Sequence, residues 1–598
     1  MGREQRTPGG ERIRPVAGAV HAWTVVLVAC TGAVGDEQSP PWPSEGMGFS
    51  EERSGAGSAA GPGSVADPLD AAGNGPADQS DGALRTDGVM RDADPELFDI
   101  AERYFPGQSM GATPERLVRL TRTQLELTAR SVLGEAYDRS IAMAMPRDPL
   151  QTNYEYASIL SWNRANFTPY VDWVDAQAQR VGAAPEGVVM CAPAELGSAC
   201  PATAARAFVL RAFRGVVSEA QLDRYVDFYE AAIAEVGLAQ ATSELVRLTL
   251  TAPGYVFRDE VRTDAEGRLL PAQHLQALTY TLADAPPEAL GVDAGDPLAP
   301  AVERVLSSPF ARDKLVRFFQ AWLEVKAPDE FNIEPGVFPA FTPELAEAMK
   351  TEVERFLEHQ LRGAAPSLAG VAQATESFVT GALADIYGVV GDPDGGPVAL
   401  DPGQRLGVLT LPGVIASHSG PSTTRLVKRG VFFTRKVMCL PLGAPPPGID
   451  TSVPESAGMT ERERIETVTR SPTCQGCHAY INPFGFMLES YDPLGRFRDF
   501  DGAHPIDPSI DFEFLEEGPV RAETAVEALV RLTGSWRFQQ CFVRQLFRFY
   551  MARDEVPTDD PLLRRMFFAF AQDGAQDILA AMRVMVGDRA FSLRSEVQ

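Results

Sequence analysis

The residues with the clearest chemistry lie at 474–478, where the sequence reads C-x-x-C-H. Two thiols at this spacing can form thioethers with the vinyl groups of one haem, and the adjacent imidazole can then bind the iron. The pattern therefore predicts covalently bound haem c. Cys474 and Cys477 are the expected attachment residues, and His478 is the expected proximal metal ligand.

Two other interpretations of this pattern stay open. The cysteines of a C-x-x-C can form a short disulfide or remain a free dithiol. They can also form half of a zinc site, which needs two further ligands. The nearest candidates for those ligands, Cys439 and His504, do not form a second paired motif.

A haem with two axial ligands needs a second one, which is usually Met or His. The candidates are Met487, His418 and His504, each of which has an alternative role as core filler or loop residue; an open sixth position is a further alternative. Arg496 and Arg498 are candidates for binding the haem propionates, because guanidinium groups pair well with carboxylates. Pairing with the neighbouring aspartates is the alternative for both arginines.

The remaining cysteines predict structural disulfides. Cys191 and Cys200 lie nine residues apart, and an exported protein is expected to join them. Cys439 and Cys541 then pair by elimination. Two buried free thiols are the alternative for this second pair.

The first residues indicate export. An arginine-rich leader precedes a short apolar stretch, and the stretch ends in Leu27-Val28-Ala29-Cys30, which resembles a bacterial lipobox with Cys30 as the lipidated residue. The alternative is an ordinary secretory signal. The following segment is rich in Gly, Ala, Ser, Pro and Asp, so it is expected to form a flexible acidic tether. Together these features predict a cell-envelope lipoprotein, anchored to the membrane and facing the periplasm or the cell surface.

The body that must position the motif is predicted to be mainly α, built of several helical bundles with a small cytochrome-c-like region and long loops. The predicted helix signals are a start at Thr113-Pro114-Glu115, a stop at Gly134, a capping box at Ser218 and Gln221, and amphipathic runs at 310–325, 343–361 (capped by Thr342), 536–551 and 561–571. The expected segments are a signal peptide (1–29), a linker (30–95), helical domains (96–185, 186–262, 263–388), the C-x-x-C-H domain (389–505) and a C-terminal helical domain (519–598).

Composition excludes several classes of function. The net charge of −27 argues against general nucleic-acid binding, because an acidic surface repels phosphate backbones. No run reaches the ~20 apolar residues of a membrane-spanning helix. The sequence also lacks the G-x-S-x-G, H-E-x-x-H and Walker patterns, which leaves little support for a hydrolase.

Several segments resemble a family of large bacterial envelope proteins, built from consecutive domains of unknown function and described as cytochrome-associated. Its central domain is domain of unknown function fifteen-ninety-two. The similar segments are 116–134, 211–214, 404–410, 429–431, 474–496 and 541–550. The chain departs from the family pattern at Arg425-Leu426, at Asn482, which replaces an aspartate, and at Met487. The resemblance implies a haem c protein of the cell envelope and implies no particular reaction.

The sequence therefore favours an exported, lipid-anchored c-type haem protein that acts in electron transfer or an envelope redox reaction. Its expected partners are the membrane and a redox partner protein. The alternative is a non-redox envelope scaffold or binding lipoprotein whose cysteines are disulfide staples.

Overall fold

The computed structural model describes residues 87–188, 199–392, 394–444 and 458–595, which belong to one compact unit, Asp67–Gln598. The predicted signal peptide, the lipidation residue Cys30 and the linker up to residue 86 lie outside these ranges. Cys191 also lies outside them. Lipid anchoring and the Cys191–Cys200 disulfide therefore stay predictions.

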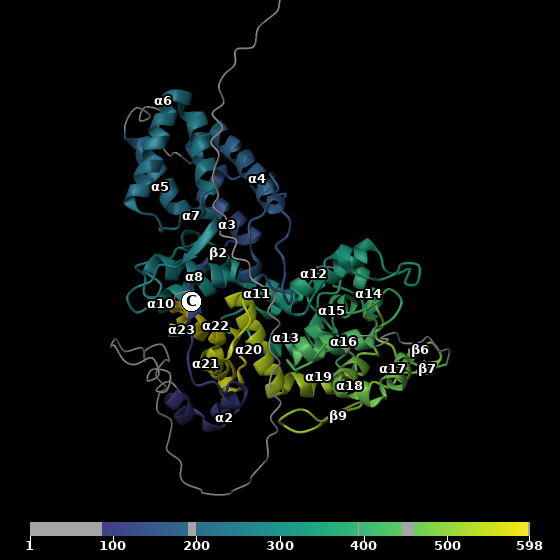
Figure 1. Ribbon diagram of the computed structural model, residues 1–598. Helices are drawn as coiled ribbons and strands as arrows, with labels where there is room; N and C mark the ends of the chain where they lie inside the picture. Colours follow the sequence, from purple (N-terminus) through teal and green to yellow (C-terminus); the bar gives the residue numbers. More distant parts are fainter. Residues whose placement is uncertain (1–86, 189–198, 393, 445–457, 596–598) are drawn as a thin grey trace, which may run out of the picture. The chain divides into compact units, whose positions relative to one another are not determined.

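The first large group of helices has a core of its own, centred on Tyr170, Phe208 and Leu245. The capping box predicted at Ser218 and Gln221 is confirmed at the start of its longest helix. That helix is interrupted at Gly237, whose φ of 79° is a left-handed conformation that glycine adopts readily. The helices of this group are α3 (Arg122–Leu133), α4 (Arg164–Ala183), α5 (Cys200–Ala212), α6 (Glu219–Leu250) and α7 (Pro253–Val256) (Figure 1).

The helix start predicted at Thr113-Pro114-Glu115 is wrong. Residues Arg116–Arg119 form strand β2, which pairs antiparallel with β3 (Phe257–Glu260). Helix α3 begins at Arg122, where the side chains of Thr121 and Gln124 form a capping box. The predicted stop at Gly134 is the C-cap of this helix. The local signal was therefore overridden by a pairing with residues about 140 positions away.

The main core is rich in aromatic side chains from two helices that are distant in the sequence. Phe318 and Trp322 of α11 (Pro309–Trp322) contact Phe542 of α20 (Trp536–Met551), with ring centroids 5.7 and 5.4 Å apart. Contacts of this kind contribute beyond the burial of their area. The other helices packed around this core are α2 (Pro95–Tyr104), α8 (Pro271–Ala283), α9 (Pro287–Leu290), α10 (Leu298–Leu306), α12 (Pro343–Gln360), α13 (Leu368–Gln373), α19 (Ala525–Gly534), α21 (Asp560–Ala571), α22 (Ile578–Gly587) and α23 (Arg589–Ser592).

The C-x-x-C-H motif lies in a third group of shorter helices. These are α14 (Gly381–Tyr387), α15 (Pro412–Ser417), α16 (Leu426–Phe432), the π-helical turn η7 (Phe433–Val437), α17 (Glu461–Thr469) and α18 (Pro472–Phe486). Figure 1 shows α16, α17 and α18 close together, with the short strands β6 and β7 nearby.

Strands are few and short in the described residues, where they occur only as two-stranded pairs. In addition to β2–β3, the pairs are β1 (Thr113–Pro114) with β10 (Arg594–Ser595), β4 (Glu376–Ser377) with β5 (Val398–Ala399), β6 (Phe500–Asp501) with β7 (His504–Pro505), and β8 (Ile510–Phe512) with β9 (Val520–Ala522). The prediction of a mainly α fold is confirmed. Among the described helices, none combines the length and apolar character that crossing a membrane requires.

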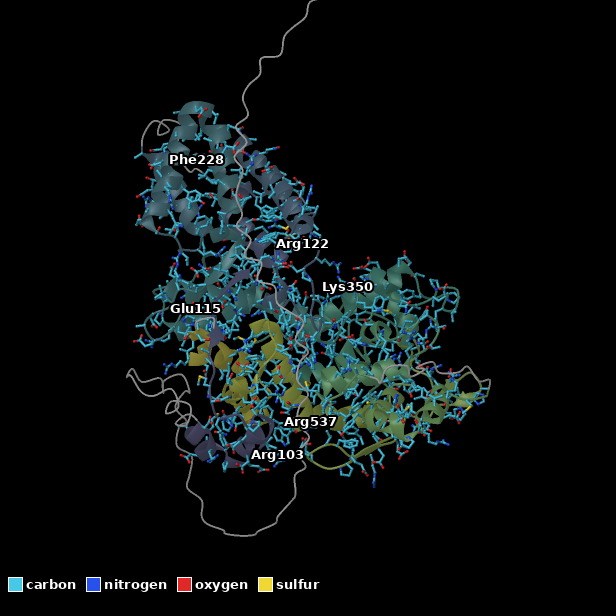
Figure 2. All side chains as sticks on the ribbon, in the orientation of Figure 1. Arg103, Glu115, Arg122, Phe228, Lys350 and Arg537 are labelled. Carbon is cyan, nitrogen blue, oxygen red and sulfur yellow. A yellow bond between two sulfur atoms is a disulfide. The ribbon has the colours of Figure 1, made fainter. Side chains whose placement is uncertain are left out.

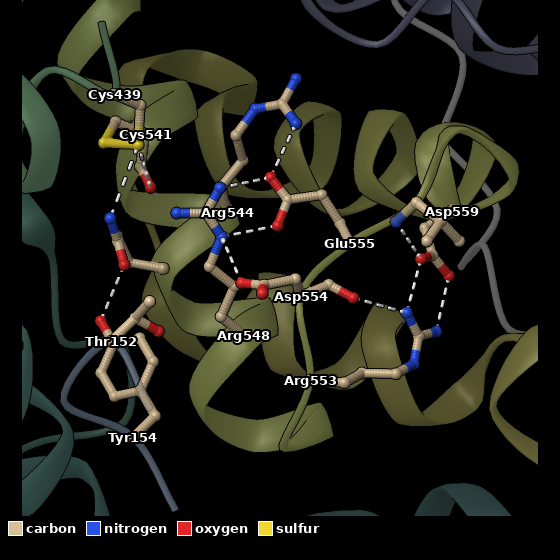
Figure 3. Close-up of polar contacts among 12 residues, drawn as sticks. Thr152, Tyr154, Cys439, Cys541, Arg544, Arg548, Arg553, Asp554, Glu555 and Asp559 are labelled. Carbon is tan, nitrogen blue, oxygen red and sulfur yellow. Dashed lines mark hydrogen bonds and ion pairs between the residues drawn. A yellow bond between two sulfur atoms is a disulfide. The ribbon is translucent and has the colours of Figure 1, made fainter. Parts of the chain in front are cut away.

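The disulfide predicted between Cys439 and Cys541 is confirmed. It joins the end of η7 to α20 and so connects the motif region to the main core. Gln545 lies beside it, with Nε2 3.6 Å from Cys439 Sγ, and accepts a 2.8 Å hydrogen bond from the hydroxyl of Tyr154 (Figure 3).

Candidate functional site

Helix α18 presents the three motif side chains on one face. Pro472 occupies its first turn, where the missing N–H removes no helical hydrogen bond. Cys474, Cys477 and His478 follow at relative positions i, i+3 and i+4, which are neighbours on a helix surface. All three side chains are half-buried. The helix therefore places two thiols and an imidazole together at an accessible surface.

Helix α16 fixes the position of α18 through close backbone contact. A Cβ at Gly430 would overlap the carbonyl oxygen of Ile481, and a Cβ at Gly485 would overlap that of Leu426. The hydroxyl of Thr434 also donates to Tyr480 O at 3.0 Å. These contacts need glycine at both positions, because any larger residue would push the two helices apart.

A buried arginine holds the chain that follows α18. Arg429 of α16 is 1% exposed and donates to three backbone oxygens, those of Leu488, Tyr491 and Asp492, at 2.8, 2.7 and 3.1 Å. It also donates to Ser419 Oγ at 2.8 Å. Hydrogen bonds from a charged donor are stronger than those between neutral groups. Arg429 therefore holds the segment 488–492, which follows the motif helix, against α16.

A chain of hydrogen bonds determines which nitrogen of His478 carries the proton. The hydroxyl of Thr469 donates to Ile465 O at 2.8 Å, so its oxygen accepts from Asn482 Nδ2 at 3.1 Å. Asn482 Oδ1 then faces His478 Nδ1 at 2.7 Å, and this oxygen can only accept. Nδ1 therefore carries a proton, and in the neutral ring the lone pair lies on Nε2. Within the described part of the chain, Nε2 has no hydrogen-bond partner.

This tautomer is the one that a metal-binding histidine needs. Ligating histidines usually donate their other ring N–H to an oxygen acceptor, which fixes the ring and makes the ligating nitrogen more basic. Sequence reasoning noted Asn482 only as a departure from the family pattern. Its position four residues after His478 could have revealed it, because such residues are neighbours on a helix.

Both motif thiols are free, whereas Cys439 and Cys541 form a disulfide. Cys474 Sγ accepts a 3.3 Å hydrogen bond from the hydroxyl of Ser471. Cys439, one of the two further ligands considered for zinc, is in a disulfide and is not available as a thiolate ligand. In the ranges that the structure describes, no three His, Cys, Asp or Glu side chains are grouped to hold a metal ion.

The candidates for a second axial ligand have different surroundings. Met487 is fully buried in the main core. His418 is 3% exposed, its ring stacks on Phe432 at 3.8 Å, and its Nε2 is 2.9 Å from Leu323 O. Burial lowers the pKa of His418 to about 3, which keeps its ring neutral. His504 is half-buried on β7. Met487 and His418 thus have packing roles, and the identity of a sixth ligand stays a prediction.

The two arginines proposed for propionate binding also differ. Arg498 forms an ion pair with Asp501 at 2.7 Å, as its alternative interpretation expects. The backbone N–H of Arg496 donates to Asp492 Oδ1 at 2.9 Å. Its guanidinium has no hydrogen bond or ion pair to the described residues, so Arg496 is the freer of the two cations.

Comparison with known proteins supports the predicted resemblance over two segments. Residues 276–389 match PSD4, a protein of unknown function (DUF1592). Residues 405–501, which contain the motif, match PSCyt3, a protein of unknown function (DUF1588). No curated protein and no solved structure matches the chain.

Proposed function

We propose that this chain is an exported, lipid-anchored c-type haem protein that acts in electron transfer or an envelope redox reaction. The observation that carries the proposal is the hydrogen-bond chain from Thr469 through Asn482 to His478, which makes Nδ1 the donor and directs Nε2 of the neutral ring to be the ligating nitrogen, on the helix that carries two free thiols. A motif that served only as a disulfide staple would not need this arrangement.

The donor set fits a haem. Cys474 and Cys477 would hold it by thioethers, and His478 Nε2 would bind the iron. Haem bound in this way supplies reversible one-electron transfer, at a potential set by its ligands and surroundings.

The chain's own residues prepare this surface in two ways. Asn482 keeps the His478 ring in one orientation and increases the basicity of Nε2. An aromatic pair lies one helical turn beyond Cys477, where Tyr480 and Phe514 have ring centroids 4.3 Å apart. Phe514 is 41% exposed, and this pair offers apolar surface next to the thiols.

Covalent haem is the direct test. The full chain is produced in a host with haem-maturation machinery, separated on a denaturing gel and stained for haem peroxidase activity. We expect a stained band that disappears in Cys477→Ser. The control is His359→Gln, which changes a half-buried histidine that pairs with Glu376 outside the motif. If the host loads another C-x-x-C-H protein while this chain folds without colour, the proposal is wrong.

Asn482 provides a second test, of the proximal ligand in the protein with haem attached. Asn482→Leu removes the acceptor at similar size, so haem should stay attached while the reduction potential rises, because the histidine becomes a weaker donor. Asn482→Asp, which restores the residue usual in the family pattern, should lower the potential. Potentials that are equal in all three proteins would show that the hydrogen bond does not tune His478.

The second candidate function is a non-redox envelope scaffold, which the Cys439–Cys541 disulfide favours because it staples the motif region to α20. A folded, colourless protein with Cys474 and Cys477 oxidised to each other would support this function instead.

A further inference from the structure

A cavity of about 590 Å³ lies well apart in sequence from the motif. Its walls come from β2 and the start of α3, the loop at 150–160, helices α8 and α11, and Phe549 and Tyr550 of α20. This volume lies within the range of small-molecule binding sites, roughly 300–1,000 Å³. Nothing in the proposed haem function uses this cavity.

One carboxylate in the lining already has its hydrogen-bond donors within the protein. Asp284 accepts hydrogen bonds from Lys314 Nζ at 2.7 Å, Arg317 Nη2 at 2.6 Å and Gln124 Nε2 at 2.8 Å. The pKa of Asp284 is lowered: burial opposes ionisation, but the charges of Lys314 and Arg317 outweigh it. Asp284 is therefore ionised and already accepts hydrogen bonds from three side chains, so it has little capacity left to bind a ligand.

Glu155 also lines the cavity and is unpaired. Its carboxyl group has no hydrogen bond or ion pair to any residue in the described ranges. Although Glu155 is exposed to solvent, partial desolvation by the cavity walls, with the nearby Asp284 carboxylate adding to it, raises its pKa to about 7. At neutral pH this group can therefore either donate or accept a hydrogen bond.

A second unpaired group is the hydroxyl of Tyr550. Its side chain is 3% exposed and lines the cavity, yet its oxygen has no hydrogen-bond partner among the described residues. Buried hydroxyls usually find a partner, so an unpaired one at a cavity wall indicates a missing polar group.

Two lysines, Lys326 and Lys428, also line the cavity. Lys428 Nζ donates only to Ser417 O, at 3.1 Å, and Lys326 has no partner for its ammonium group in the part of the chain described here. Burial, with the charge of Lys326 adding to it, lowers the pKa of Lys428 to about 8. Glu324 is the neighbouring acid, and burial raises its pKa. An anion placed here would relieve the repulsion between the two lysines.

The charges of the lining residues also favour an anionic ligand. Cationic side chains outnumber acidic ones around the cavity, although the whole chain has 54 Lys and Arg against 81 Asp and Glu. Arg119 and Arg258 are neutralised by Asp148 and Glu260, which lie outside the lining, so the positive charge left for an anion is that of Lys326 and Lys428.

We propose that this cavity binds a small hydroxylated organic anion. Its anionic group would lie next to Lys326 and Lys428, and its hydroxyl groups next to Tyr550 and Glu155. The proposal is independent of haem binding, since no motif residue lines the cavity.

Calorimetric titration of the full chain tests the proposal. The probes are three hydroxylated anions (D-glucuronate, D-gluconate and L-lactate), neutral D-glucose, and sulfate as an anion without carbon-bound hydroxyls. We expect at least one organic anion to bind with a dissociation constant below about 10 mM, and glucose to bind at least about tenfold more weakly. If none of the three organic anions binds, or if glucose binds equally well, the proposal is wrong.

Three variants locate the binding. The double variant Lys326→Met/Lys428→Met should weaken binding of the organic anion by about tenfold or more. The control is Lys350→Met, which removes one half-buried lysine that pairs with Glu354 on α12 (Figure 2). Equal weakening in the control and the double variant would reveal a nonspecific charge effect and overturn the proposal.

Tyr550→Phe separates a ligand contact from a structural role. Because the hydroxyl has no partner in the described residues, its removal should leave the melting temperature unchanged or higher. Binding of the organic anion should weaken several-fold, whereas sulfate binding should not change. If Tyr550→Phe leaves the affinity for the organic anion unchanged, the hydroxyl group is not part of the site and the proposed orientation is wrong.

Discussion

Removing the Cys439–Cys541 disulfide should lower the free energy of unfolding substantially. The bond closes a loop of 102 residues that contains α17 and the motif helix α18. In the chain-entropy description, a cross-link of about 100 residues restricts the unfolded chain by about 4.7 kcal/mol. Removing a native disulfide lowers the free energy of unfolding by about 2–5 kcal/mol, because residual structure in the unfolded chain reduces the effect of the cross-link.

The change to make is the double variant Cys439→Ala/Cys541→Ala. Cys541 is fully buried on α20, so serine there would place an unpaired hydroxyl in the core, whereas alanine removes only the sulfur. The variant therefore reports mainly on the lost cross-link. A small additional loss is expected from the cavity that the two sulfur atoms leave.

The assay is urea denaturation of the full chain, followed by far-UV circular dichroism, with and without a thiol reductant. Without reductant, the variant should unfold at a clearly lower midpoint than the original protein. The control is Cys474→Ser/Cys477→Ser. All proteins are produced in a host without haem-maturation machinery, so the control loses no haem, and its midpoint should stay close to the original because these thiols are free in the structure. Any remaining response of the alanine variant to reductant would report on the predicted Cys191–Cys200 bond.

The comparison without reductant decides the outcome. Equal midpoints for the original protein and the alanine variant would refute the reasoning, because a 102-residue loop cannot then be restricting the unfolded chain.

Three further predictions concern other parts of the chain. Burial raises the pKa of Glu352 from 4.5 to about 7. Its protonated carboxyl therefore stabilises the fold fully below pH 4.5, and this stabilisation is lost as pH rises through 7. In denaturant titrations across this range, the free energy of unfolding of Glu352→Gln should fall by up to about 3 kcal/mol less than that of the original protein. Gly430→Ala should destabilise by about 1–3 kcal/mol through overlap with Ile481 O. The matched variant is Gly476→Ala, on the partner helix α18, where a Cβ would meet open space; it should stabilise the protein by about 0.5–1 kcal/mol. Equal melting temperatures for Gly430→Ala and Gly476→Ala would contradict the packing argument. Cys30→Ser should abolish labelling by a fatty-acid analogue, and labelling that persists would rule out Cys30 as the anchor.

Helices whose signals are local could be predicted from the sequence. Thr342 caps α12, the side chains of Ser218 and Gln221 cap α6, and α20 spans 536–551 as predicted. These signals work because a cap and its N–H group lie three residues apart, so the interaction is complete within one turn. The start at Thr113 fails because Arg116–Arg119 find a strand partner at 257–260, which no local pattern contains.

The spacing of the C-x-x-C-H motif comes from the sequence itself, and its residues at i, i+3 and i+4 share a face because 472–486 is helical in the structure, a helix that no local signal had predicted. Pairing of Cys439 with Cys541 could be reached by elimination, although only the structure distinguishes it from two buried thiols. The cavity was decided by tertiary structure alone. Glu155, Lys326, Lys428 and Tyr550 come from four distant segments, and they line one cavity only after the helices pack.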